Sequence, residues 1–112
     1  MVKTITIGDK SLNLKASLYT AHKYKQDTGK NLLTTLDRMS NAEQDSDATS
    51  NIVEELIYIT YLMNCEYNNQ YVDYDTWLKD FDGVLDNNDW IIDVAMLAAT
   101  PFRKSQANPT RK

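Results

Sequence analysis

The segment 51–67 constrains the fold of this chain more than any other part of it. Its apolar side chains recur at helical spacing along one broad arc, which carries Ile52, Val53, Leu56, Ile57, Ile59 and Met63. The opposite arc is interrupted mainly by Glu54 and Glu55 and otherwise holds Tyr58, Tyr61, Leu62 and Cys65. A helix that is apolar nearly all round either lies at the centre of its domain or keeps one face for a partner.

The N-terminal segment predicts a β-hairpin. Residues 2–7 are rich in β-branched side chains, residues 11–15 alternate polar and apolar, and a glycine-containing turn over 8–10 separates them. Because an isolated hairpin is only marginally stable in water, we expect this one to pack on helices.

Helix-start and helix-stop residues predict the remaining elements. Ser17 and Gly29 bracket a helix over 17–28, and Asn31 caps a short helix that carries Leu32, Leu33, Leu36 and Met39. Residues 40–50 are polar and form a linker, and the long helix over 51–67 starts at Thr49 or Ser50.

Two further helices are expected in the last third of the chain. Asp73 or Asp75 caps a short one that ends near Gly83, and Asp86 or Asn87 caps one over 88–100. Pro101 stops this last helix, because the residue before a proline is biased away from helical angles.

These elements predict an α+β fold that is mostly helical, with the hairpin packed on a bundle of four to five helices. Residues 1–101 are expected to form a single globular domain, with the hairpin over 2–15 and helices over 17–101, followed by a disordered basic tail over 102–112. The expected core consists of Ile5, Ile7, Leu14, Leu18, Leu33, Leu36, Ile52, Leu56, Ile59, Met63, Leu78, Phe81, Trp90, Val94 and Leu97.

Length and composition narrow the classes of protein. With 112 residues the chain is too short for a cofactor domain beside a substrate domain, and no apolar run is long enough to span a membrane. The N-terminus has no long apolar segment of the kind that signals secretion, and the single Cys65 favours a reducing compartment.

Charge is distributed unevenly along the chain. Residues 1–30 carry six lysines and two aspartates, whereas residues 31–100 carry fourteen acids and only two basic side chains. The acidic middle disfavours binding to nucleic acid, which requires a basic surface. It forms either a solvated face or a docking face for a basic partner or the tail of a neighbouring copy.

The residues that could carry chemistry are few. His22 and Cys65 are the only side chains of their kinds, so neither a zinc site nor a supported Cys–His nucleophile pair is present. The acids around Gly83 do not match a calcium-binding loop, and no phosphate-binding glycine motif occurs. Tyr19, His22, Lys23, Tyr24 and Lys25 form a small aromatic and basic cluster that a packed helix explains better than a nucleic-acid site. The sequence therefore predicts no catalytic residues, no cofactor and no metal.

A protein-binding surface is the remaining hypothesis. The second arcs of the two long helices carry more apolar side chains than a small core obviously needs, and they predict a partner-binding surface of Tyr58, Tyr61, Leu62, Ile92 and Met96. The alternative is that one arc packs on the hairpin and the other on the remaining helices.

The order of elements and two local patterns resemble a known family. The first helix ends in Tyr-x-x-x-Thr-Gly-x-x-Leu-Leu over residues 24–33, and Tyr-Asp-Thr-Trp-Leu occupies residues 74–78 after the long apolar helix. Over roughly residues 1–100 the chain resembles the tail assembly chaperones of long-tailed phages and prophages of Gram-positive bacteria.

This resemblance implies a non-catalytic protein of the host cytoplasm that is not present in the mature virion. It implies two partners, the tape measure protein and the tail tube protein, and the unpaired hairpin edge leaves self-association open. An acidic inhibitor that mimics DNA is the alternative function, and it requires carboxylates along one continuous exposed stripe.

Overall fold

A computed structural model describes residues 2–40, 46–79, 81 and 89–102. In this part of the chain the order of elements is β1 (Val2–Ile7), β2 (Lys10–Lys15), α1 (Leu18–Thr28), α2 (Leu32–Ser40), α3 (Ser46–Asn68), α4 (Tyr74–Leu78), α5 (Asp89–Ala99) and a 3-10 turn η1 (Thr100–Phe102). The fold is a mostly helical α+β arrangement with an N-terminal antiparallel hairpin, as the sequence predicts.

The hairpin is held in register by its turn and by both of its faces. Gly8 adopts a positive φ of 62° in the two-residue turn between Ile7 and Lys10, where glycine is favoured. The inner face buries Ile5, Ile7 and Leu14, whereas cross-strand hydrogen bonds at 2.6 Å (Thr4–Asn13) and 3.0 Å (Thr6–Ser11) lie on the outer face.

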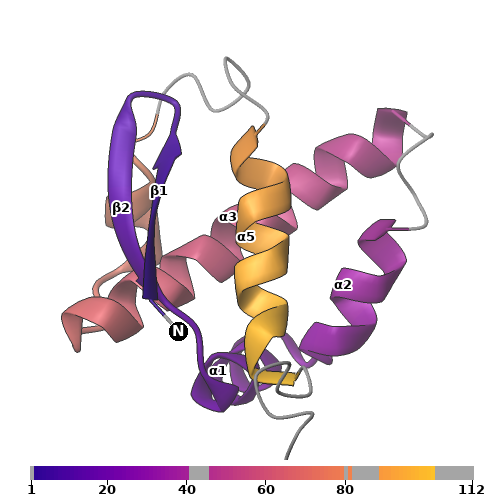
Figure 1. Cartoon of the computed structure of the whole chain (residues 1–112), viewed down its shortest axis with the longest axis horizontal. Helices are drawn as coiled ribbons and strands as arrows, with labels where there is room; N and C mark the ends of the chain where they lie inside the picture. Colours follow the sequence, from indigo (N-terminus) through magenta and orange to yellow (C-terminus); the bar gives the residue numbers. More distant parts are fainter. Residues whose placement is uncertain (1, 41–45, 80, 82–88, 103–112) are drawn as a thin grey trace, which may run out of the picture.

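The long helix α3 is the centre of the packing. It contacts β2, α5 and α1, and α5 in turn contacts β1 and α2. Figure 1 shows α3 running behind α5, with the hairpin on one side of α5 and α2 on the other. The interior joins side chains from all of these elements, of which the largest fully buried ones include Ile7, Leu14, Tyr24, Leu32, Ile59, Leu62, Trp90 and Val94.

Several predicted helix ends are confirmed. The Ser17 hydroxyl accepts a hydrogen bond from the Tyr19 amide at 3.1 Å, and Gly29 ends α1 in the left-handed region with φ of 76°. Asn31 accepts from the Thr34 amide at 3.0 Å, and Asp73, not Asp75, caps α4.

Other predictions about the elements are wrong or lie outside the described residues. α3 begins at Ser46, so Thr49 and Ser50 lie inside the helix and residues 46–50 are not linker. Phe102, predicted as the first residue of the basic tail, lies in η1 and is half-buried against the core. The predicted caps Asp86 and Asn87 and the rest of the tail, residues 103–112, lie outside the described residues.

Three residues of the expected core are exposed. Leu18, Leu33 and Leu78 expose 63%, 45% and 38% of their surface. In α1 the buried positions are Thr20 and Tyr24, so this helix is rotated relative to the face that apolar spacing predicts. The rotation is possible because Tyr24 is large and apolar and its hydroxyl finds partners inside the fold.

A half-buried carboxylate helps to hold α1 on α3. Glu66 accepts hydrogen bonds from the Ser17 hydroxyl at 2.5 Å and from the Thr20 hydroxyl at 3.0 Å. Hydrogen bonds to a charged acceptor are stronger than neutral ones, so this contact fixes the start of α1 against the end of α3.

Candidate partner-binding surfaces

The structure divides the predicted partner-binding surface into three parts. Leu62 is fully buried and Tyr61 exposes only 7% of its surface, so these two residues lie in the core and not on the exposed surface that the sequence predicts. Both belong to the core around α3, because the hairpin and α5 cover one side of this helix and α4 covers another. Tyr58 is half-buried, and Ile92 and Met96 are exposed.

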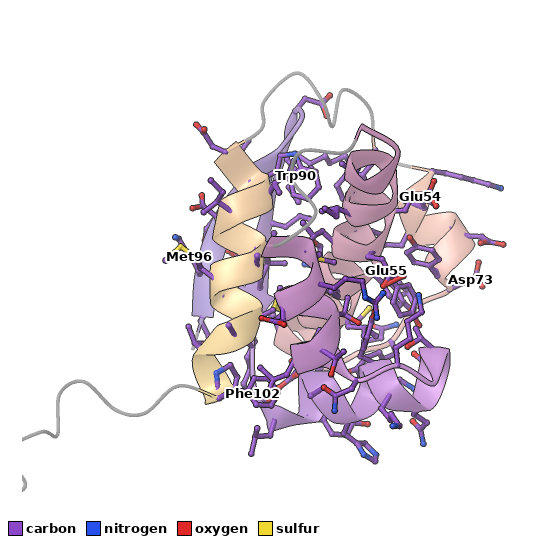
Figure 2. The ribbon with its side chains drawn as sticks, turned by 90° about the vertical axis from the view of Figure 1, so that its right-hand side faces the viewer. Glu54, Glu55, Asp73, Trp90, Met96 and Phe102 are labelled. Carbon is purple, nitrogen blue, oxygen red and sulfur yellow. The ribbon has the colours of Figure 1, made fainter. Side chains whose placement is uncertain are left out.

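Ile92 and Met96 form an apolar strip on the outer face of α5. They lie one helical turn apart and expose 64% and 50% of their surface. Asp93 lies beside them and is 3.9 Å from the ammonium group of Lys3 on β1. Figure 2 shows Met96 at one edge of the molecule, with Glu54, Glu55 and Asp73 towards the other, so the α5 strip is separate from the exposed side of α3.

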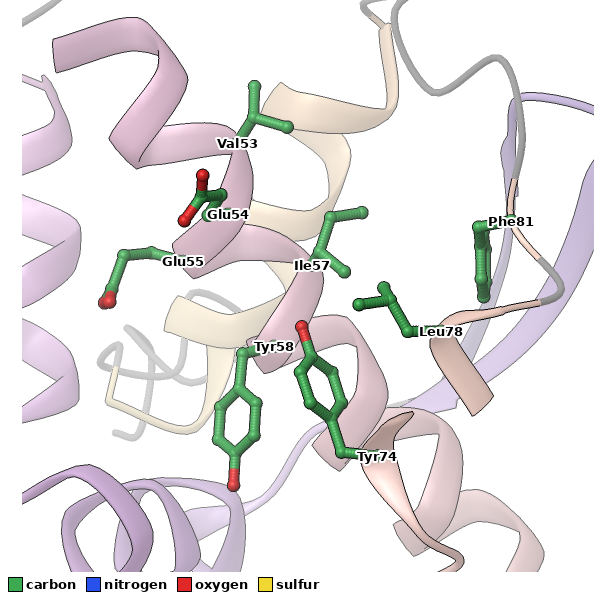
Figure 3. A pocket seen from close by; sticks show the side chains of 8 residues that line it. All are labelled: Val53, Glu54, Glu55, Ile57, Tyr58, Tyr74, Leu78 and Phe81. Atoms are coloured by element: carbon green, nitrogen blue, oxygen red, sulfur yellow. The ribbon is translucent and has the colours of Figure 1, made fainter. Parts of the chain in front are cut away.

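A groove between α3 and α4 is the second candidate surface. Its volume is about 610 Å³, within the range of about 300–1,000 Å³ that is typical of ligand sites. Figure 3 shows Leu78 and Tyr74 pointing across the groove towards Ile57. The lining is mostly apolar or aromatic and consists of Val53, Glu54, Glu55, Ile57, Tyr58, Tyr74, Leu78 and Phe81.

A chain of aromatic rings fixes α4 against α3. The ring centroids of Tyr74 lie 4.9 Å from those of both Tyr58 and Tyr61, in edge-to-face geometry. Trp77 continues the chain, at 5.4 Å from Tyr61 and 4.5 Å from Phe81. Such pairs stabilise by about 0.5–1.5 kcal/mol each beyond the area they bury, which allows a helix of only five residues to keep its place.

Hydrogen bonds from the hydroxyl and indole groups of these rings support this arrangement. The Tyr58 hydroxyl donates to Asp27 at 2.6 Å, and the Tyr61 hydroxyl donates to the carbonyl of Val72. The Trp77 indole donates to the Asn64 side chain at 3.1 Å. The Asn64 amide donates in turn to the carbonyl of Asn13 at 3.0 Å, so this side chain joins α4 to the hairpin.

Glu55, at the rim of the groove, is already neutralised within the chain. Its carboxylate is 2.9 Å from the Lys30 ammonium group and accepts a hydrogen bond from the Tyr24 hydroxyl. Burial acts to raise the pKa of Glu55, but the bonds from Tyr24 and Lys30 outweigh it and hold the pKa below its usual value. The same burial, with Glu55 nearby, raises the pKa of Tyr24 to about 12.

Two further carboxylates belong to the elements that form the groove: Glu54 lines it, and Asp75 follows Tyr74 on α4. The pKa of Tyr74 is raised first by burial and then by the negative charges of Glu54, Asp75 and Glu55. Glu54 and Asp75 are exposed, and no ion pair joins either of them to another described residue. One end of the groove therefore carries unneutralised negative charge.

The remaining residues that the sequence singled out lie elsewhere. In the aromatic and basic cluster of α1, Tyr24 is buried, whereas Tyr19, His22 and Lys25 are exposed. The Lys23 ammonium group lies 5.2 Å from the centroid of the Tyr71 ring. Cys65 is buried, and among the described residues no group of three or more His, Cys, Asp or Glu could hold a metal ion. No helix in the described ranges has both the length and the apolar character to cross a bilayer.

Sequence reasoning missed the groove itself. Leu78 and Phe81 were assigned to the core and Tyr74 was noted only as part of a motif. The available signal was their spacing, because residues 74, 78 and 81 stand four and three positions apart and share one side of a helical turn.

No protein-family model, curated protein or solved structure matches the chain. The function is therefore inferred from the residues themselves and from their distances, burial and charges.

Proposed function

We propose that this protein is a non-catalytic tail assembly chaperone of a long-tailed phage or prophage. It acts in the host cytoplasm, covers apolar helical segments of the tape measure protein and helps to recruit tail tube subunits. It leaves the particle before the virion is complete.

The groove between α3 and α4 is the single observation that carries this proposal. A chaperone of this kind must present apolar surface to its client without losing its own fold, and helix-in-groove docking is a common way to do so. The groove offers the partly exposed side chains of Val53, Leu78 and Phe81 to a partner, and Ile57 is a buried part of its lining. The aromatic and hydrogen-bonded contacts behind the groove hold α4 in place. The α5 strip of Ile92 and Met96 adds a second apolar surface.

The charges of the described residues favour this function over the DNA-mimic alternative. A mimic needs carboxylates that stand free along one continuous stripe. Here Asp27, Glu55 and Asp93 are each within 4 Å of a lysine ammonium group, and Asp73 is used as a helix cap. Paired and capping acids are poorly suited to replace a row of phosphates.

Co-expression with the tape measure protein and the tail tube protein encoded in the same phage genome tests the proposal. We expect the tagged wild-type chain to keep the tape measure protein in the soluble fraction and to co-purify with it. We expect a combined Leu78→Glu, Ile92→Glu and Met96→Glu variant to lose this complex, because all three side chains are exposed and their replacement leaves the core intact. Circular dichroism of the variant checks the fold.

Two results would contradict the proposal. One is a tape measure protein that aggregates equally with and without the chain. The other is salt-sensitive capture of a DNA-binding protein in place of the tail proteins, which would favour the mimic.

A further inference from the structure

The walls of the groove are built from residues one helical turn apart. Val53 and Ile57 stand four positions apart on α3, and Tyr74 and Leu78 stand four positions apart on α4. Rows of this kind form ridges, and the space between two ridges accepts the side chains of a third helix. Phe81 lies beyond the end of α4 and adds a third apolar side chain to this wall.

The form of the groove selects a helical occupant. None of its lining residues belongs to a strand, so an extended segment that docked there would find no sheet edge to pair with. A helix satisfies its own backbone hydrogen bonds and needs only apolar surface from the groove.

The chain's own C-terminal segment is a poor occupant. Residues 103–112 contain only Ala107 and Pro109 as apolar side chains, beside four basic ones. These residues are too small and too polar to fill a groove lined by Ile57, Leu78 and Phe81. The C-terminal segment is therefore not the occupant, and we take the occupant to be a segment of another molecule.

The charge around the groove indicates which side chains the docked segment should carry. Glu54 lines the groove, Asp75 follows Tyr74 directly on α4, and neither is ion-paired with a described residue. Glu55 is taken by Lys30, and Lys79 follows Leu78 at the other end of α4. The Tyr74 end of the groove is thus acidic, and basic side chains there gain favourable Coulomb energy.

We propose that this groove binds one amphipathic helix, whose apolar side chains recur at i, i+4 and i+7 and are flanked by Lys or Arg near Glu54 and Asp75. The inference deepens the proposed function and rests on it for the identity of the partner as a tape measure segment. The surface and the chemistry of the occupant rest on the groove alone.

Fluorescence anisotropy with synthetic helical peptides of about 18 residues tests the inference, since shorter helices are marginal in water. Three fluorescein-labelled peptides are compared: one with a leucine stripe flanked by lysine, one with the same stripe flanked by glutamate, and one with the stripe replaced by glutamine. We expect the lysine-flanked peptide to bind about tenfold more tightly than the glutamate-flanked one at low salt, and the glutamine peptide not to bind.

Matched variants locate the binding. Leu78→Glu should abolish binding of the lysine-flanked peptide, whereas Ile92→Glu, the same change at an exposed position on α5, should leave it unaltered. A Glu54→Gln and Asp75→Asn double variant should remove the preference for lysine without affecting the fold. An Asp9→Asn and Asp93→Asn double variant is the control, because it changes the net charge by the same amount at positions outside the groove. It should keep the preference for lysine.

Three outcomes would overturn the inference: equal affinity for the lysine- and glutamate-flanked peptides, binding lost in Ile92→Glu but retained in Leu78→Glu, or no binding of any leucine peptide. The peptide experiment and the co-purification experiment can each contradict one proposal without contradicting the other. Co-purification without peptide binding at the groove would reject this site and keep the proposed function. Peptide binding without co-purification would keep the site and reject the function.

Discussion

The two faces of α3 meet the rest of the molecule through different chemistry. In the interior that α3 shares with the hairpin, α1 and α5, residues Ile59, Thr60, Leu62 and Met63 are fully buried. Towards α4, the contacts are made by aromatic rings whose hydroxyl or indole groups are hydrogen-bonded. A groove of about 610 Å³ stays open between α3 and α4.

The difference shows how a small domain can carry both a core and a binding face on one helix. Aliphatic side chains stabilise by excluding water completely, and a gap among them would lose contacts outright. Tyrosine and tryptophan side chains also make hydrogen bonds through their hydroxyl and indole groups. These bonds keep α4 in place although the space between α3 and α4 is not completely filled.

Truncation of one leucine on each face should give the largest contrast. We expect Leu62→Ala to lower the free energy of unfolding by about 2–5 kcal/mol, because it leaves a cavity in the closed core. Leu78→Ala, at a side chain that is 38% exposed, should cost less than about 1 kcal/mol. Urea unfolding measures both, and losses of equal size would show that the two faces are not distinct.

Asn64 joins the two faces and should have the next largest effect. Asn64→Ala leaves the Trp77 indole and the Asn13 carbonyl without their hydrogen-bond partner, which we expect to lower the free energy of unfolding by about 1–3 kcal/mol. Urea unfolding followed by tryptophan fluorescence measures the loss. Asn68→Ala, at an exposed position at the end of α3, is the control and should leave stability within about 0.5 kcal/mol of wild type.

Tyr24→Phe tests the polar contacts at the groove rim. Loss of the hydroxyl that bonds to Thr35 and Glu55 should lower the free energy of unfolding by about 1–2 kcal/mol near neutral pH. Because the pKa of Tyr24 is raised from 10.0 to about 12, the folded chain keeps this proton in a range where the unfolded chain releases it. Stability should therefore fall as the pH rises through this window, and fall less steeply in the variant.

Urea unfolding at several pH values between about 9 and 12 measures this slope. Tyr19→Phe, which alters an exposed tyrosine, serves as the control. Identical slopes for Tyr24→Phe and wild type would show that the Tyr24 hydroxyl is not held in the folded state as described.

Gly29→Ala should have the smallest effect of the series. The φ of 76° at this position is strained for any residue with a Cβ atom, although no neighbouring atom lies within 4 Å of the place a Cβ would take. We expect a loss of about 1 kcal/mol, read as a lower midpoint of thermal unfolding. A variant as stable as wild type would mean that α1 does not end as described, and Gln26→Ala on exposed α1 surface is the control.

Local signals predicted much of the fold. Capping side chains at Ser17, Asn31 and Asp73 and the glycine at position 29 act within a few residues of themselves, so their effect can be read without knowing the tertiary structure. The alternation of the hairpin similarly identified its buried face, including Ile5, Ile7 and Leu14.

The orientation of helices could not be obtained in the same way. α3 is apolar nearly all round, so periodicity does not tell which arc packs on the hairpin, and Leu62 was placed on the surface although it is fully buried. In α1 the leucine at position 18 is exposed while Tyr24 is buried, because Thr35 and Glu55, which come later in the chain, satisfy its hydroxyl. The groove depends on how α4 packs against α3, which is a tertiary contact that no local pattern specifies.

Nuclear magnetic resonance titration of the labelled chain with the lysine-flanked leucine peptide tests the account most directly. We predict that the signals of Val53, Ile57 and Leu78 shift progressively while those of Leu62 and Ile59, on the closed face of α3, stay in place. Shifts that centre on Ile92 and Met96 of α5, or that spread evenly through the core, would contradict the claim that the groove face of α3 is the binding face.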